Sequence, residues 1–260
     1  MFYVKQALKN GGKMELNQPL ILAIETATRA GSVSVARGIE VLASRAGDPS
    51  SSHSTDLVEN IDRVMNDAGV ELSEVDFFAA AIGPGSFTGL RIGLATAKSL
   101  AVAAQRKCAG ISTLEAVAFQ AGPSERTVAL LPAGRGEVFA QMFAIHNEVA
   151  RALDEARHLS PSEMIERYRK HRLVLWAGEG AQAQLEFLRR EATSRNIELA
   201  TASPASNGSR LWIVSPHFDK VSDAVAHLGL QQWRRGELVN PEDLRANYVR
   251  PSDAEIKSKT

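Results

Sequence analysis

The hydrophobic and polar positions along this chain follow two periods, and the change from one to the other separates predicted strands from predicted helices. Short apolar runs and two-residue alternation predict strands, whereas apolar residues three and four positions apart predict helices. The first half therefore reads as three strands, a helix, a strand, a helix, a strand and a short helix. Strands are expected at 20–25, 32–36, 39–45, 75–82 and 108–111, and helices at about 54–68, 88–105 and 113–119.

The second half repeats this order without obvious sequence identity. Strands are expected at 127–131, 137–145, 149–156, 173–176 and 197–199, and helices at 161–168 and 179–192. A last helix is expected from a cap at Ser222 and Asp223 to Arg235, followed by an extended segment at 241–251. This order is typical of the ribonuclease-H-like fold, and two such lobes in tandem make the actin-like (ASKHA) architecture of the α/β class.

The same pattern divides the chain into segments. Residues 20–121 are expected to form the first lobe and 122–251 the second, with the C-terminal helix packing back on the first lobe. Residues 1–19 read as an N-terminal extension and 252–260 as a loose tail. Because Gly11-Gly12-Lys13 precedes Met14 and can be encoded by a ribosome-binding sequence, we expect Met14 to be the natural start.

Composition excludes several classes of protein. The 260 residues include 30 basic and 30 acidic side chains, so net charge gives no reason to bind nucleic acid or anionic lipid. Cys108 is the single cysteine, which fits a reducing compartment, and we expect it to be buried rather than reactive. No run of about 18 apolar residues predicts a membrane helix, and no signal peptide is evident. We therefore expect a cytoplasmic protein without membrane contact.

The stretch from Ala80 to Gly93 is the strongest candidate for a functional loop, because three glycines and a proline fall within seven positions, 83–89, just before a helix. It could bind an anion at the helix N-terminus or form a structural turn. The Walker spacing fails, since Thr88 and Leu90 stand where glycine is required, and so does the nucleophile elbow around Ser86. We therefore predict a structural loop, with bound phosphate as the minor alternative. Its residues are Gly83, Pro84, Gly85, Ser86, Phe87, Thr88, Gly89 and Arg91.

Residues for catalysis or for a metal are poorly represented. Glu25 follows the first strand, where nucleotide-binding relatives of this fold place an acid, but Ala27 has a Cβ where the backbone would approach phosphate. The alternative role for Glu25 is to hydrogen-bond its own turn. No two of the six histidines are three or four positions apart, so no helix carries a ready metal site. We predict no catalytic residue, no metal and no cofactor held by this chain alone.

Two further features favour contacts with other molecules. Arg91, in the first turn of a helix, is expected to face an acidic side chain or, less favoured, a phosphate. The basic run 167–172 reads as a solvated helix end, with an RNA-backbone contact as the alternative. The alanine-rich helix at 88–105 is apolar on nearly every side and needs burial beyond its sheet face. With the helix at 54–68, it predicts an apolar two-helix surface for another subunit.

Several motifs together resemble the TsaB (YeaZ) family of Gcp-like domains. They are Ile24-Glu25-Thr26-Ala27-Thr28, His53-Ser54, residues 83–93, Gly136-Glu137-Val138-Phe139 and Tyr248-Val249-Arg250-Pro251. The chain departs from the family where Glu25 replaces the usual aspartate and where Pro132-Ala133 replaces an acidic residue.

The resemblance implies a non-catalytic scaffold subunit in the synthesis of threonylcarbamoyladenosine, next to the anticodon of tRNAs that read A-starting codons. It implies docking on a TsaD-type transferase, with a TsaE-type ATPase joining the pair, tRNA bound indirectly, and ATP and metal held by the partners. Homodimerisation through the same face is one state that the chain could adopt without the partner. The alternative is a metal-independent hydrolase or peptidase-like enzyme, or an ATP-binding enzyme, of the same superfamily. The residues expected at the partner contact are His53, Leu57, Ile61, Met65, Leu90, Leu94, Ala97, Lys98 and Ala101.

Overall fold

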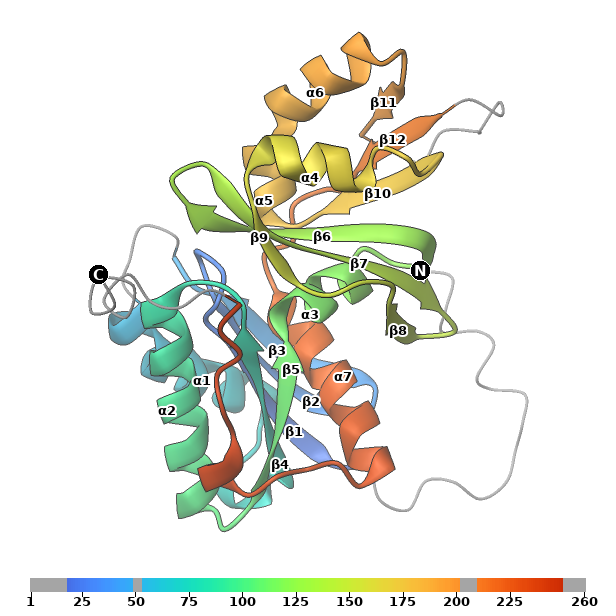
Figure 1. Cartoon of the computed structure of the whole chain (residues 1–260). Coiled ribbons are helices and arrows are strands. Elements are labelled where there is room, and N and C mark those ends of the chain that lie inside the picture. Colours follow the sequence, from blue (N-terminus) through green and yellow to red (C-terminus); the bar gives the residue numbers. More distant parts are fainter. Residues whose placement is uncertain (1–17, 49–52, 202–209, 250–260) are drawn as a thin grey trace.

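Two lobes, each a mixed sheet with helices on it, make up the computed structural model of the chain, which describes residues 18–48, 53–201 and 210–249. Figure 1 shows the lobes one above the other, with the second lobe at the top. Both sheets contain antiparallel strands on one side and parallel strands on the other.

The first lobe is built on five strands that are ordered β3-β2-β1-β4-β5. They are β1 (Leu20–Glu25), β2 (Ser32–Arg37), β3 (Glu40–Ala46), β4 (Phe77–Gly83) and β5 (Lys107–Ser112). β1 pairs antiparallel with β2 and parallel with β4. Every residue of β1 is buried, which explains why its sequence is a continuous apolar run rather than an alternating one.

Helices cover both faces of this sheet. The face that contains Leu22 and Ile24 packs against α1 (His53–Ala68) and α2 (Phe87–Ala103). The opposite face, with Ile21 and Ala23, packs against α3 (Thr113–Gln120) and α7 (Val221–Arg235). The C-terminal helix α7 thus lies on the sheet of the first lobe, far from the strand that precedes it in sequence.

The second sheet repeats the strand order of the first and adds one strand at its edge. Its order is β11-β12-β10-β6-β7-β8, and β9 also pairs with β7. The strands are β6 (Ser124–Gly134), β7 (Glu137–His146), β8 (Val149–Ala152), β9 (Arg157–Leu159), β10 (Leu173–Ala177), β11 (Glu198–Ala200) and β12 (Leu211–Val214). Its outer face packs with α4 (Pro161–Tyr168), α5 (Glu179–Ala183) and α6 (Leu185–Ser194) around Tyr168, Trp176 and Trp212.

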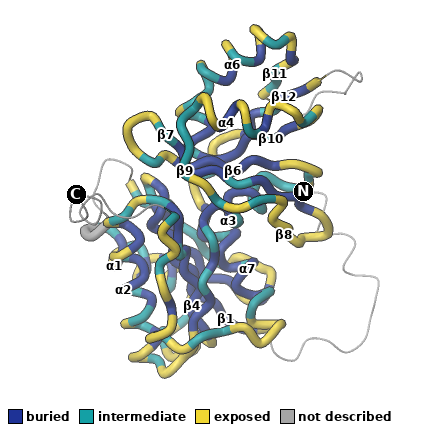
Figure 2. The backbone as a smooth tube through the Cα atoms, viewed as in Figure 1, coloured by how far each residue is buried: buried dark blue, intermediate teal, exposed yellow. Residues whose placement is uncertain are grey.

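A single apolar core joins the lobes. The cluster around α3 and α7 includes Ile21 and Ala79 from the first sheet together with Leu131 and Phe143 from the second. Figure 2 shows this junction in dark blue, as buried as the interior of either lobe. The lobes are therefore held together by side-chain packing as well as by the linker.

The predicted fold class is confirmed, with local corrections. The strand expected at 149–156 ends at Ala152, just before Asp154, whose carboxylate accepts from the backbone N–H of Met142 at 2.7 Å, and no strand was expected at β9. The helix expected at 179–192 breaks at Gln184, whose φ of −98° and ψ of 9° lie outside the helical range. The expected side-chain cap at Ser222 and Asp223 is wrong, since α7 begins at Val221 and its N-cap residue, Lys220, makes no side-chain cap.

Some expectations lie outside the described residues or were not made. Met14 and the rest of residues 1–17 lie outside the described part, as does the expected tail at 252–260. The sequence analysis predicted no strand at β12.

Candidate functional site

The glycine-rich loop and the turn between β1 and β2 form one closely packed unit. The backbone N–H of Ser86 donates to the carbonyl of Ala27 at 2.8 Å, and the Thr26 hydroxyl donates to the carbonyl of Gly89 at 2.8 Å. The Ser86 hydroxyl also caps α2 by accepting from the backbone N–H of Gly89 at 3.2 Å. The loop therefore fixes both where the turn sits and where α2 begins.

Two of its glycines are required by close approach. A Cβ at Gly85 would lie 2.5 Å from the carbonyl oxygen of Ala27, and a Cβ at Gly93 would lie 2.0 Å from the Thr26 hydroxyl. Any larger residue would push the turn away from α2. These contacts support the structural reading of the loop.

Glu25 uses its carboxylate within the turn. It is completely buried and accepts from the backbone N–H groups of Ala27 at 2.5 Å and Thr28 at 2.7 Å, and from the Thr28 hydroxyl at 2.6 Å. Burial raises the pKa of Glu25 to about 7, although the hydrogen bonds from Thr28 and Ala27 lower it. The next backbone N–H, that of Arg29, donates to the carboxylate of Glu179 on α5 at 3.0 Å.

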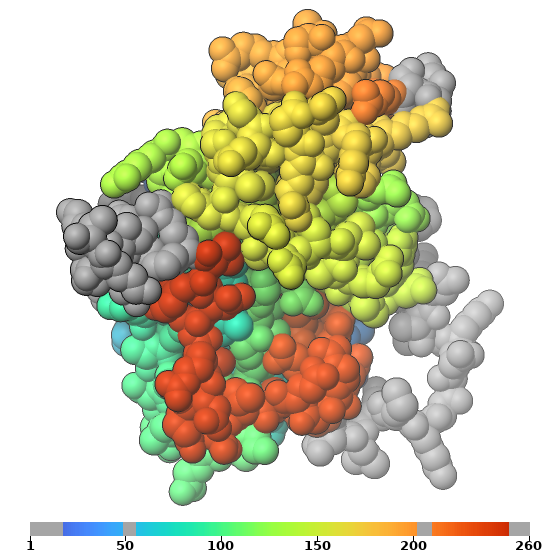
Figure 3. All heavy atoms as spheres, viewed as in Figure 1, coloured from blue at the N-terminus to red at the C-terminus, as the bar shows by residue number. Residues whose placement is uncertain are grey.

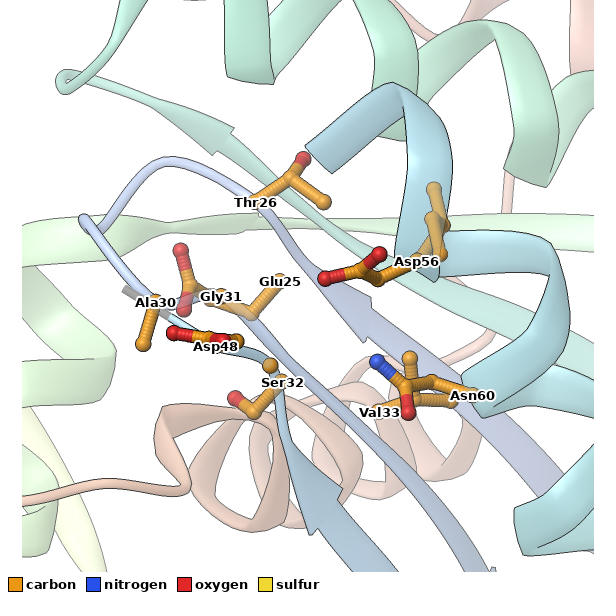
Figure 4. Close-up of a pocket in the computed structure, with 11 residues that line it drawn as sticks. Glu25, Thr26, Ala30, Gly31, Ser32, Val33, Asp48, Asp56 and Asn60 are labelled. Carbon is orange, nitrogen blue, oxygen red and sulfur yellow. The ribbon is translucent and has the colours of Figure 1, made fainter. Parts of the chain in front are cut away.

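These contacts leave no room for a phosphate at the turn. The successive N–H groups that would bind an anion already donate to the protein's own carboxylates. The cavity beside Glu25 measures about 10 Å³, close to the smallest volume that holds one water molecule. Figure 4 shows Glu25 lining it together with Asp48 and Asp56, so a phosphate would also meet acidic neighbours.

The flank of α2 that faces away from α1 is covered by the segment Val239–Tyr248, which we call the C-terminal strap. Val239 bridges to the backbone of Cys108, Leu244 is buried beside α2, and Lys98 donates to the Leu244 carbonyl at 3.1 Å. Figure 3 shows the strap, in red, lying over the first lobe.

Arg91 corrects one expectation. It lies 3.9 Å over the ring of Phe87 and within 3.5 Å of the Tyr248 hydroxyl, and within the described residues no carboxylate pairs with it. Its charge is therefore balanced by an aromatic face instead of the acidic side chain that we expected.

Most residues predicted at the partner contact face the interior. Met65 and Lys98 are half-buried, and His53 is the first residue of α1, with a side chain outside the described part. The residues with at most 7% exposure are Leu57, Ile61, Leu90, Leu94, Ala97 and Ala101. The physical reason is that their spacing of three and four residues marks the stripe that packs on the sheet, so these six cannot form an outward contact in this fold.

Different side chains of the same two helices face outward. Val58 is 68% exposed and Val102 64% exposed, while Ala95 and Ser99 are exposed small residues. We call the outer α1–α2 surface the set Val58, Met65, Ile92, Ala95, Ser99 and Val102. The sequence signal for them was available, because they lie on the sides of each helix that its buried stripe leaves open.

The remaining chemistry-bearing residues have local partners. Cys108 is buried as predicted, and burial raises the pKa of its thiol to about 11. His146 lies beside Glu125 and His227 beside Glu148. Across residues 18–48, 53–201 and 210–249, no three His, Cys, Asp or Glu side chains are grouped as a metal would require. Among the described helices, none combines the length and apolarity needed to cross a bilayer.

The basic run at the end of α4 is partly neutralised. Arg167 pairs with Asp154 at 2.8 Å and Arg169 pairs with Glu166 at 2.7 Å. Lys170 and Arg172 are exposed and have no such partner within the described residues.

The chain is similar to proteins of threonylcarbamoyladenosine synthesis. The family model described as TsaD, tRNA N6-adenosine threonylcarbamoyltransferase, matches residues 47–200. The chain is 34% identical over 122 residues to the tRNA threonylcarbamoyladenosine biosynthesis protein TsaB of Escherichia coli (strain K12), covering 46% of this chain and 52% of that protein. It is 48% identical over 69 residues to the tRNA N6-adenosine threonylcarbamoyltransferase of Brucella ovis, covering 26% of this chain and 19% of that protein.

A solved structure covers more of the chain. A Pseudomonas aeruginosa protein described as uncharacterized, with similarity to the peptidase YeaZ, superposes with a TM-score of 0.69 at 27% identity, covering 89% of this chain and all of that one. By contrast, the matched segments span about half of the curated TsaB relative and about a fifth of the curated transferase.

Proposed function

The chain belongs to the TsaB (YeaZ) family, and from this premise we propose that it is a non-catalytic subunit that pairs with a TsaD-type transferase in threonylcarbamoyladenosine synthesis on tRNA. The observation that carries the proposal is the turn at Glu25. Its anion-binding groups are already occupied by Glu25 and Glu179, so the fold is present without a free phosphate site there. A scaffold subunit would use this fold to present a contact surface to its partner.

The outer α1–α2 surface is the contact that we propose for the partner. It combines two exposed valines with small side chains, so a helix of another protein can approach α2 closely. The surface is held in place by the glycine-rich loop below α2 and by the C-terminal strap at its side. Burying such apolar area contributes about 25 cal/mol per Å² before the cost of association.

In this arrangement the partners supply the chemistry. A TsaD-type subunit holds the metal and transfers the threonylcarbamoyl group, a TsaE-type subunit hydrolyses ATP, and this chain needs no cofactor of its own. The same surface would serve a homodimer when the transferase is absent.

The peptidase-like alternative rests on the words used for the Pseudomonas aeruginosa protein. In this chain the hydroxyl groups of Ser34 and Ser222 contact each other, and the Ser34 hydroxyl also contacts Asp223. Both serines are fully buried where α7 packs on β2, so a substrate cannot reach them. Their contacts hold the C-terminal helix on the first lobe and give no support to hydrolysis.

The test is a charge placed on the proposed contact. Val58→Asp should leave the protein folded, because the side chain is exposed, yet weaken pairing with a TsaD-type protein by on the order of 100-fold, since an unpaired charge at an interface centre costs several kcal/mol. Val149→Asp is the matched control, because Val149 is 55% exposed on the second lobe. Gel filtration of the mixed proteins measures pairing, and equal pairing of both variants would remove this surface from the account.

A further inference from the structure

The second lobe collects arginines at the edge of its sheet where three parallel strands begin. β6, β10 and β12 lie side by side and run in the same direction, so their first residues meet at one edge (Figure 1). Arg126 lies near the start of β6, Arg172 directly precedes β10, and Arg210 directly precedes β12. Positions far apart in sequence thus become neighbours.

Arg172 and Arg210 lie on the same face of the sheet. Each stands two residues before a side chain that is buried in the core beneath α4, Val174 or Trp212. Side chains two positions apart in a strand point to the same face, and strand register keeps that face common to neighbouring strands. The register of β6 is irregular beside Arg126, and the charge of Arg126 acts on His171 in the turn after α4. All three arginines are exposed.

The turn after α4 adds Lys170 and His171 to this group. The pKa of His171 is lowered, first by partial burial and then by the charges of Arg126 and Lys170, while Asp154 opposes the change. The cations are therefore close enough to influence one another.

Nearby acids do not neutralise the group. Asp154 contacts Arg167 and Tyr168, and Glu166 contacts Arg169 and Arg195. Glu125 contacts His146, and Glu198 pairs with Leu211, one position after Arg210, so its side chain points to the opposite face.

Direct partners of the cations are also lacking. Within the described residues Arg126, Lys170 and Arg172 have no ion-pair partner, and Arg210 donates only to the carbonyl of Arg169. The neighbouring sequence 202–209 contains no acidic residue.

We propose that this basic edge, Arg126, Lys170, Arg172 and Arg210, binds the phosphate backbone of RNA, so that the subunit contacts tRNA directly. A chain with no net charge concentrates unpaired cations here, and arginine forks match phosphate geometry. Such contacts orient an RNA without reading its bases. The identity of the RNA as tRNA rests on the proposed function, whereas the phosphate contact does not.

The test reverses the charges and keeps a matched control. Arg126→Glu/Lys170→Glu/Arg172→Glu is compared with Arg37→Glu/Arg106→Glu/Lys107→Glu, three exposed cations of the first lobe, so both variants change net charge equally. Fluorescence anisotropy with a labelled, unmodified tRNA transcript measures Kd across salt concentrations, for the chain alone and with a TsaD-type partner. The edge variant should bind about tenfold more weakly or worse, with a salt slope reduced by about 2 to 3, because each lost phosphate contact removes about 0.7 to 0.9.

Three outcomes are decisive. Equal Kd and slope for the two variants overturn the basic edge. Loss of binding to phosphatidylserine vesicles, with tRNA binding unchanged, overturns it in favour of a lipid surface. Pairing with the TsaD-type protein is read separately by gel filtration, so a failure to pair counts against the proposed function while the anisotropy still tests the edge.

Discussion

Replacing Glu25 with glutamine tests the account of the turn through its dependence on pH. The change Glu25→Gln removes the charge but keeps an oxygen that accepts from the backbone N–H groups of Ala27 and Thr28. The new amide can donate to the Thr28 hydroxyl, so each contact of the turn has a replacement. The substitution therefore isolates the charge.

The size of the effect follows from the pKa of Glu25, which burial raises from 4.5 to about 7. Because the folded state favours the protonated acid, this stabilisation is complete below pH 4.5 and is lost as the pH rises to about 7. At about 1.36 kcal/mol per pKa unit, the wild type loses about 3 kcal/mol over that interval. Glu25→Gln should lose none of it, and should be the more stable protein at pH 8.

Urea unfolding at pH 5 and pH 8 measures this difference in both proteins. The expected result is a free energy of unfolding that falls between these pH values by about 2 to 3 kcal/mol more in the wild type than in the variant, since a small part of the effect is already lost at pH 5. An identical fall in the two would show that Glu25 is ionised in the fold at little cost, and would refute the account of a desolvated carboxylate.

Other predictions concern the loop and the strap, and thermal unfolding measures each. Gly93→Ala should destabilise the protein by about 1–3 kcal/mol, because the new Cβ clashes with Thr26. Adding Thr26→Ala to the same chain should recover part of that loss. Strictly additive effects of the two substitutions would contradict the contact. Leu244→Ala should cost about 2–3 kcal/mol because Leu244 is the strap residue that is buried in the core of the first lobe, whereas the control Leu153→Ala, at a 37% exposed position, should cost under about 1 kcal/mol. Equal costs would show that the strap is loosely held.

Much of the fold was predictable because hydrophobic residues recur with clear periods along its strands and helices. The β1 run and the alternation in β2 identified two neighbouring strands, and the repeated order predicted a second lobe. The early end of β8 was not predictable, because Asp154 just beyond it contacts Met142 across the sheet. The short β12 follows a polar stretch of sequence, and its four residues are too few to show a hydrophobic period.

The sequence predicted which phosphate-binding and catalytic motifs are missing better than it predicted which side chains face outward. The spacing around Ser86 excluded a Walker loop, and the contacts of Thr26 and Ala27 explain what the glycines do instead. The outward side of α2 was missed because the stripe spaced by three and four residues, which packs on the sheet, was interpreted as the partner contact. The sequence predicted an extended segment at 241–251, but not that it packs beside α2, because its residues follow no hydrophobic period.

The basic edge shows a similar limit. The run 167–172 is visible in sequence, but Arg126 and Arg210 join it only through strand register. The cluster was therefore not visible in the sequence, because its arginines are far apart there and come together only in the folded sheet.

The most direct test of the scaffold role is reconstitution of threonylcarbamoyl transfer to tRNA with each subunit omitted in turn. The account predicts that this chain alone transfers nothing, that a TsaD-type and a TsaE-type protein without it transfer little, and that adding wild-type chain or Val149→Asp, but not Val58→Asp, restores transfer. Full transfer without this chain, or transfer by this chain alone, would contradict the account.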